Sequence, residues 1–150
     1  MTTIPPIRKS VCVPLSPDRA FELFTTRLPT WWPLETHSLS AGTGAVPEHV
    51  LFEPRLGGKI LETLADGTTQ PWAEITLWDP PHHFEMAWHV GRARAAATRV
   101  SVTFKGTDTG TQVDLIHDGF EALGESATST AENYRSGWDP VLARFVQGGA

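Results

Sequence analysis

The chain has 150 residues, of which 40% are hydrophobic and 19% are charged. This length and composition predict one globular domain, residues 1–150, with a substantial hydrophobic core. The formal net charge of −5 argues against a general nucleic-acid or anionic-membrane binder, because both partners repel an acidic surface. The local basic cluster of Arg92, Arg94 and Arg99 is interpreted as a solvated edge.

The cysteine content and the N-terminal sequence indicate where in the cell the protein is expected. Cys12 is the single cysteine, which excludes intrachain disulfides and zinc-ribbon ligand sets and predicts a small strand residue. The first ten residues, MTTIPPIRKS, contain no apolar segment, so we expect no signal peptide. No run approaches the ~18 apolar residues that a membrane span needs. We therefore expect a soluble, cytoplasmic protein.

The N-terminal part predicts a strand followed by a helix. Residues 7–14 alternate in polarity, which is typical of a strand. Ser16 can cap a helix over residues 17–28, where apolar residues recur at helical spacing. The next stretch, PTWWPLETH, sets two adjacent tryptophans between prolines. It predicts an irregular connection, which can include a second short helix before Gly42.

From about residue 46 to residue 120 the pattern changes to strands separated by turns. HFEMAWHV, TRVSVTFKGTDTG and TQVDLIHDGF alternate, which is typical of antiparallel strands with one wet face. KILETLADG ends in an Asp-Gly hairpin signal. About six consecutive strands therefore form a meander. In PWAEITLWDPP, strict alternation places Ala73, Ile75 and Leu77 on one face and Trp72, Glu74, Thr76 and Trp78 on the other.

After GESATST the apolar spacing becomes helical again. One stripe contains Tyr134, Trp138, Val141, Leu142 and Phe145. Pro140 disturbs this helix, because proline cannot donate to the carbonyl four residues back. Either the helix kinks between Ser136 and Pro140, or Asp139 caps a second helix. We favour the kink, because the stripe keeps its phase across the break.

The order of strand, one or two short helices, about six strands and a long C-terminal helix predicts an α+β domain. A sheet with one apolar face needs a cover, and the terminal helix supplies it. A strongly bent antiparallel sheet around one helix need not close completely. The gap between the helix and the far part of the sheet can then remain as a pocket.

This layout resembles the helix-grip fold of the START-like superfamily, also called SRPBCC, which includes the birch-pollen-allergen proteins. Within it, the chain is similar to the group named for activators of the ATPase of the 90-kDa heat-shock chaperone. The segments that carry the resemblance are FELFTTRLPTWW, FEPRLGGKI, EITLWDPPHHFEMAW, GTQVDLIHDGF and GWDPVLARF. The resemblance implies about seven curved antiparallel strands wrapped on the long C-terminal helix.

The resemblance also implies a pocket between the C-terminal helix and the concave face of the sheet, with its mouth near the segment after the first helix. Trp31 and Trp32 then form part of its wall or lid. The alternative is that both indoles fill the core beneath the loop. The expected ligand-binding residues are Trp31, Trp32, Trp72, Trp88, His117, Tyr134 and Trp138.

His117 is the leading candidate for chemistry. It shares the apolar face of the last strand with Val113 and Leu115, so we expect it to point inward. There an imidazole can orient a ligand or carry a proton, or it is a core histidine satisfied by the backbone or a nearby acid. Glu62 and Glu74 can supply an acid or base, but solvated strand positions explain them more simply. We find no metal-ligand spacing, nucleophile elbow or nucleotide-binding loop, and expect no metal and no cofactor.

Three functions are compatible with these residues. The preferred hypothesis is a binding protein for a small hydrophobic molecule, with aromatic walls and His117 as the orienting polar group. The second is an enzyme of the cyclase, dehydratase or hydrolase kind, with His117 and a glutamate as proton carriers. The third, implied by the resemblance, is a co-chaperone that activates the ATPase of a heat-shock chaperone. A homodimer is compatible with each of them.

Overall fold

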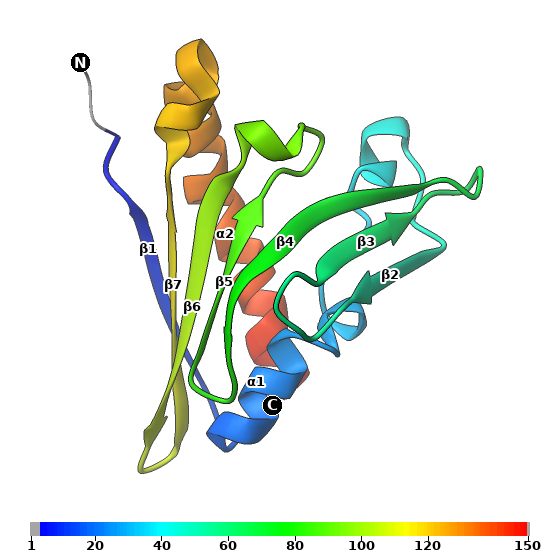
Figure 1. The fold of residues 1–150 in the computed structure, drawn as a ribbon. Helices are drawn as coiled ribbons and strands as arrows, with labels where there is room; N and C mark the ends of the chain where they lie inside the picture. Colours follow the sequence, from blue (N-terminus) through cyan, green and yellow to red (C-terminus); the bar gives the residue numbers. More distant parts are fainter. Residues whose placement is uncertain (1–3, 150) are drawn as a thin grey trace.

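The computed structural model describes residues 4–149 (Figure 1). Residues 1–3 and 150 lie outside the description, and with them the first part of the segment in which we expect no signal peptide. The elements, with 3-10 helices labelled η, are β1 (Ile7–Val13), α1 (Pro17–Phe24), η1 (Leu28–Thr30), η2 (Ser40–Thr43), β2 (His49–Phe52), β3 (Lys59–Thr63), β4 (Thr69–Asp79), β5 (His83–Trp88), η3 (Arg94–Ala96), β6 (Thr98–Thr107), β7 (Gly110–Asp118), η4 (Phe120–Ser126) and α2 (Ala127–Gly149).

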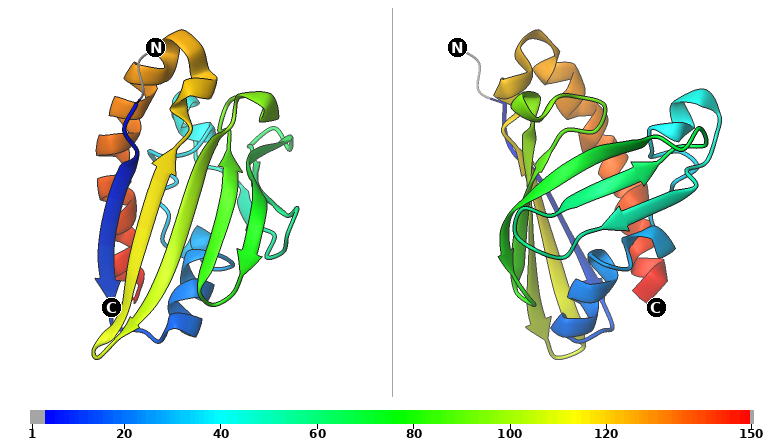
Figure 2. Two further views of the ribbon diagram at one scale, coloured as in Figure 1. Left: turned by 60° about the vertical axis from the view of Figure 1, so that its left-hand side comes forward. Right: turned by 45° about the vertical axis from the view of Figure 1, so that its right-hand side comes forward.

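Among residues 4–149, seven strands form one antiparallel sheet in the order β1-β7-β6-β5-β4-β3-β2. The strands β2 to β7 are a meander, and β1 joins it at β7, with Ile7 opposite His117 and Val13 opposite Thr111. The sheet is strongly curled and α2 lies on its concave side, with α1 packed near the C-terminal end of α2 (Figures 1 and 2). This is the helix-grip arrangement, so the predicted fold class is confirmed.

The first helix is shorter than predicted. Ser16 caps it as expected, since its Oγ accepts a hydrogen bond from the Arg19 N–H at 3.4 Å. Regular helix ends at Phe24 rather than near Leu28, because the Thr25 backbone leaves helical geometry, with φ −98° and ψ −90°. The chain then turns through η1 into the double-tryptophan segment.

The last helix is one element. α2 runs from Ala127 to Gly149, and Pro140 lies inside it on an exposed face. The alternative of a second helix capped by Asp139 is therefore wrong. The Asp139 carboxylate instead pairs with Lys9 Nζ of β1 at 2.8 Å. Of the predicted stripe, Trp138, Val141, Leu142 and Phe145 are buried and Tyr134 is half-buried. Ala131, which was not predicted, is buried on the same helix.

Aromatic rings fill the space between the helices and the sheet in two groups. Towards α1, the ring of Phe24 packs against Trp31, Phe84 and Phe145 at centroid distances from 5.0 to 5.9 Å. The second group, which we call the tryptophan cluster, consists of Trp32, Trp72, Trp88 and Trp138. Each such aromatic pair adds about 0.5–1.5 kcal/mol beyond the burial of its area.

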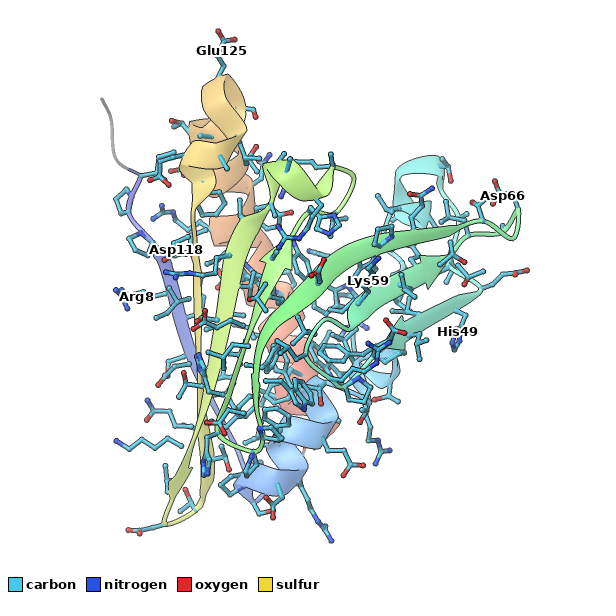
Figure 3. The ribbon with its side chains drawn as sticks, viewed as in Figure 1. Arg8, His49, Lys59, Asp66, Asp118 and Glu125 are labelled. Atoms are coloured by element: carbon cyan, nitrogen blue, oxygen red, sulfur yellow. The ribbon has the colours of Figure 1, made fainter. Side chains whose placement is uncertain are left out.

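Polar side chains lie on the outer surface and at the turns. In Figure 3, Arg8 extends outward from β1, and Asp66 marks the tip of the β3–β4 hairpin. The predicted Asp-Gly turn forms there, and Asp66 Oδ1 accepts a hydrogen bond from the Thr68 N–H at 2.9 Å. Within residues 4–149, no helix combines the length and hydropathy of a membrane span.

Candidate functional site

A cavity of about 330 Å³ lies between the N-terminal half of α2 and the tryptophan cluster. Its wall comes from the loop after η1, from β5 with the loop that follows it, and from α2. The lining residues are Trp32, His37, Trp88, Arg92, Thr130, Asn133, Tyr134, Gly137, Trp138 and Val141. The cavity is apolar at its base and polar at its rim, because its buried members are Trp32, Trp88, Trp138 and Val141, whereas the others are half-buried or exposed.

Trp32 is the centre of the apolar base. Its ring centroid lies 5.4 Å from that of Trp72, 6.0 Å from that of Trp88 and 5.9 Å from that of Trp138. Its Nε1–H donates to the His37 carbonyl at 2.7 Å. Since the backbone satisfies the indole N–H, the ring is fixed in one orientation and the loop is fixed to the ring.

The two adjacent tryptophans have different roles: one fills the core and the other lies in the cavity wall. Trp31 donates from Nε1 to the Leu23 carbonyl at 2.7 Å and packs 5.2 Å from Phe145, so it belongs to the core and lies behind the lining. Trp32 is part of the core, with 7% exposure, and it also forms part of the cavity wall. The prediction of a core residue therefore fits Trp31, and the prediction of a wall residue fits Trp32.

Irregular pairing in β4 overturns the face assignment for that strand. Its register shifts within the pairing with β3 and again, opposite β5, between Ile75 and Leu77. A bulge adds one residue to a strand and so reverses the alternation beyond it. Trp72 is consequently 1% exposed in the same core as Ile75. Leu77, predicted to share a face with Ile75, is 38% exposed, whereas Trp78, predicted to lie on the opposite face, packs against the core.

Glu62 is a buried carboxylate, and its interpretation as a solvated strand residue is wrong. Its oxygens accept four hydrogen bonds of 2.6 to 2.8 Å, from the N–H groups of Leu39 and Ser40, the Ser40 hydroxyl and Trp72 Nε1. Burial raises the pKa of this carboxyl, but the hydrogen bonds outweigh burial and hold the pKa below its ordinary value. Glu62 therefore stays charged and fastens the η2 loop and Trp72 to β3.

His117 points inward as predicted, with 0% exposure, and lies behind the lining. Trp138 Nε1–H donates to its Nδ1 at 3.0 Å, and its Nε2 lies 2.7 Å from Thr98 Oγ1. The Thr98 hydroxyl donates to the Trp88 carbonyl, so it accepts from His117 Nε2–H, and one neutral tautomer satisfies every group. Burial lowers the pKa of His117 to about 3, and the charge of Arg92 adds to the shift. The partners are thus an indole and a hydroxyl, in place of the predicted backbone or acid.

Tyr134 supplies a hydroxyl to the cavity wall. Its oxygen accepts a hydrogen bond from Trp88 Nε1–H at 3.0 Å, and its ring lies 4.6 Å from that of His117. The Tyr134 O–H has no acceptor among the side chains and backbone of residues 4–149. The hydroxyl is therefore held in place by one bond and can donate its proton to a molecule in the cavity.

The three arginines of the basic cluster, Arg92, Arg94 and Arg99, have different surroundings in the structure. Arg94 pairs with Glu74 at 3.4 Å, and Arg99 pairs with Asp118 at 2.7 Å. Both arginines are exposed, as the solvated-edge interpretation predicts. Glu74, interpreted as a solvated strand residue, is half-buried with its side chain 34% exposed. Arg92 is half-buried and lines the cavity, so the solvated-edge interpretation is wrong for this residue.

The loop after β5 holds the Arg92 side chain in place. Nε donates to the Ala96 carbonyl at 3.3 Å, and Nη2 donates to the Trp88 carbonyl at 3.1 Å. The Arg92 backbone N–H donates to the His89 carbonyl at 2.8 Å, which closes the turn. Nη1 forms no hydrogen bond with the part of the chain that the structure describes. The guanidinium is thus positioned before anything binds.

The structure brings together four of the seven predicted binding residues and sets three behind them. The lining contains Trp32, Trp88, Tyr134 and Trp138, and the layer behind it contains Trp31, Trp72 and His117. On α2, helical spacing from Tyr134 and Trp138 also leads to the lining residues Thr130, Gly137 and Val141. His37 and Arg92 come from irregular loops, and no periodic signal indicates them.

The lining offers aromatic faces and hydrogen-bond donors rather than metal ligands. Within residues 4–149, no three histidine, cysteine or acidic side chains are grouped so that they could hold a metal ion. The chemistry available here is therefore stacking, hydrogen bonding and the charge of Arg92.

A curled antiparallel sheet that grips one long helix (Figure 1) defines the class of helix-grip proteins. Residues 14–147 match the model of the family described as activator of Hsp90 ATPase homolog 1-like protein. The chain belongs to this family, as the resemblance of its sequence implied. No curated protein matches it.

Solved structures of similar fold cover almost the whole chain. An anthrahydroquino-gamma-pyrone synthase, Txn09, complexed with SUM, is 33% identical over 97% of both chains, with a TM-score of 0.67. A protein from Bacillus halodurans is 17% identical over 100% of both chains, with a TM-score of 0.69. An AHSA1-like protein from Aeromonas hydrophila is 15% identical over 95% of this chain and 90% of its own, with a TM-score of 0.63. The last two similarities show the fold alone.

Proposed function

We propose that this chain binds a small, largely apolar molecule in the cavity between α2 and the sheet. The observation that carries the proposal is a cavity of about 330 Å³ whose base is made of three buried indoles, those of Trp32, Trp88 and Trp138. This volume and this lining are typical of small-molecule sites. An apolar ring placed on these indoles loses its contact with water and gains aromatic contacts.

In this proposal the predicted binding residues have two kinds of role. The lining residues contact the ligand, and the Tyr134 hydroxyl is the orienting polar group. His117 acts through Trp138, because its Nδ1 accepts the indole hydrogen bond that fixes the ring. Trp31 and Trp72 support Trp32 from behind, at ring centroid distances of 5.7 and 5.4 Å.

The test uses the one glycine of the lining. A Cβ added at Gly137 meets only His37 Nε2, at 4.0 Å, so a larger side chain there extends into the cavity. We expect Gly137→Phe to raise the dissociation constant of the neutral fluorophore N-phenyl-1-naphthylamine by at least about tenfold, because the new ring occupies the ligand volume. Fluorescence titration of the purified variants measures this constant.

The matched control is Gly137→Ala. It adds one methyl group and raises helix propensity by about 1 kcal/mol, so it should leave the dissociation constant within about threefold of wild type. If Gly137→Phe binds the fluorophore as tightly as wild type, the probe binds elsewhere and the proposed site is wrong.

A second candidate is an enzyme of the cyclase, dehydratase or hydrolase kind. It is favoured by the 33% identity to a protein named as a pyrone synthase. Proton transfer next to a carbonyl requires a general acid at the oxygen and a base at the carbon. Both ring nitrogens of His117 are engaged, whereas Tyr134 retains a proton to donate. In this candidate Tyr134 polarises a bound carbonyl and His37, at the rim, accepts the proton.

The enzyme candidate predicts that the protein accelerates exchange of the α-hydrogens of 2-acetonaphthone with D2O, followed by NMR. Tyr134→Phe should lower the accelerated rate at least about tenfold, because the general acid is lost, while N-phenyl-1-naphthylamine still binds. Ser136→Ala, on the exposed side of α2, should change neither quantity. Exchange no faster with the protein than in buffer contradicts the enzyme candidate and leaves the binding proposal in place.

The co-chaperone role and the homodimer stay predictions. The name of the family favours the first. The co-chaperone role is tested by a pull-down with a 90-kDa heat-shock chaperone and by the ATPase rate of that chaperone with and without this protein.

A further inference from the structure

We propose that the molecule in this cavity carries an anionic oxygen group, such as a carboxylate, phenolate or enolate, beside its apolar rings, and that Arg92 binds this group. The inference rests on the proposed binding function, which leaves the charge of the ligand open. Three features of the cavity support it: the surroundings of Arg92, the donors beside it and the absence of acids from the lining.

Arg92 differs from the other arginines in its surroundings. Five of them pair with a carboxylate, namely Arg55, Arg94, Arg99, Arg135 and Arg144. Three more are exposed to solvent, namely Arg8, Arg19 and Arg27. In the range 4–149, Arg92 alone is half-buried without a carboxylate partner. A guanidinium that loses hydration without gaining a counter-ion is destabilising, so an anion from outside the chain completes this site.

The geometry of Arg92 leaves one edge of the guanidinium for a ligand. Nε and Nη2 are held by the carbonyls of Ala96 and Trp88, and Nη1 is unused within the described residues. Since the loop has already fixed the side chain, little conformational entropy is lost when an oxyanion binds. The charge acts on the interior, because it contributes to the low pKa of His117.

The rest of the lining suits the same ligand. The Tyr134 O–H has no acceptor in the described chain, and Thr130 and Asn133 add a hydroxyl and an amide on the same side of α2. None of the described lining residues is aspartate or glutamate. Two acids of the adjoining strands are already neutralised, Glu74 by Arg94 and Asp118 by Arg99. The cavity thus combines a cation and donors at its rim with indoles at its base.

The test compares two fluorophores that differ by one charged group. 8-Anilino-1-naphthalenesulfonate is anionic, and N-phenyl-1-naphthylamine is the same ring system without the sulfonate. We expect Arg92→Met to weaken binding of the sulfonate by about tenfold, because a charge-assisted hydrogen bond is lost. The neutral probe should bind within about twofold of wild type. Arg92→Lys, which keeps the charge, should weaken sulfonate binding less than Arg92→Met.

The control is Arg135→Gln, which removes an exposed arginine of α2 outside the lining and should leave both affinities unchanged. If Arg92→Met weakens both probes equally, Arg92 only supports the loop, and the anionic ligand is ruled out while the binding function stands. If Arg92→Met changes neither affinity, the anionic ligand is also ruled out. If wild type binds neither probe, the proposed binding function itself fails.

Discussion

Glu62 and His117 are both fully buried on the inner side of the sheet, and their surroundings favour a charged carboxylate in the first and a neutral imidazole in the second. Glu62 is surrounded by donors, which stabilise a carboxylate. His117 has one donor and one acceptor as partners, which suit a neutral imidazole. Strand parity predicts where such a side chain points, but its partners come from 10 to 23 residues away along the chain. The sequence therefore indicates burial here without indicating charge.

Replacing Glu62 with glutamine should lower the free energy of unfolding at pH 7 by about 3 kcal/mol. The amide nitrogen cannot accept, so at least one buried donor loses its partner and a charged acceptor is lost with it. Urea denaturation followed by tryptophan fluorescence measures the change. Glu48→Gln, at an exposed position, is the control and should stay within about 0.5 kcal/mol of wild type. A loss for Glu62→Gln no larger than that of the control would contradict the anchoring role.

The same variant has a defined dependence on pH. Because the folded-state pKa of Glu62 lies below its ordinary value of 4.5, the unfolded chain takes up the proton first as the pH falls. The stabilisation by Glu62 is therefore complete above the ordinary pKa and is lost as the pH falls through the folded-state pKa. The stability difference between wild type and Glu62→Gln should be constant from about pH 8 to about pH 5 and should shrink below that range.

At the scale of elements, β4 shows where period-2 reasoning fails. Alternation holds along β5, β6 and β7, whose inner residues are those expected from the sequence. In β4 two register shifts interrupt it, and Trp72 and Trp78 both pack against the core. A bulge is fixed by pairing with the neighbouring strands. Pro71 lies at the first irregularity, where a proline inside a central strand is typical of a bulge, but no residue in AEITLWD marks the second. Alternation along β4 therefore does not predict the position of Trp72 in the cluster.

Helix α2 contains Pro140, whose side chain is exposed and does not pack in the core. Pro140 is exposed inside α2, and it removes one backbone hydrogen bond. We expect Pro140→Ala to raise the free energy of unfolding by about 1–3 kcal/mol, since alanine is the better helix former. Urea denaturation measures the gain.

Proline in a loop provides the contrast for this prediction. Pro54 is exposed outside regular structure, where Pro54→Ala should lower stability or leave it unchanged, because proline restricts the unfolded chain. If Pro140→Ala is no more stable than wild type, the residue must contribute contacts that offset its helix penalty.

At the scale of the whole molecule, the sequence predicts the architecture better than the site. Alternating strands and one helical stripe each leave an apolar face, and only their mutual packing buries both. This argument, with the family resemblance, predicts the helix-grip fold that the structure contains. The end of α1 and the continuity of α2 at Pro140 depend on local geometry that a propensity argument describes poorly.

The site is only partly predictable because its two sides have different origins. Tyr134 and Trp138 lie on the helical stripe and Trp88 lies on an alternating strand, so the periodicities find them. Arg92 and His37 enter the lining from connections, whose course depends on specific hydrogen bonds such as Trp32–His37 within the loop and Glu62–Leu39 across the fold. The apolar part of the cavity could thus be inferred from the sequence, and the cation could not.

The division of the cavity wall between framework and connections has an evolutionary consequence. The indoles belong to the packed interior, where most substitutions destabilise the fold. His37 and Arg92 sit on loops that tolerate changes in length and composition. Substitutions at the polar rim can therefore change which ligand binds, while the fold and the aromatic base of the cavity stay the same.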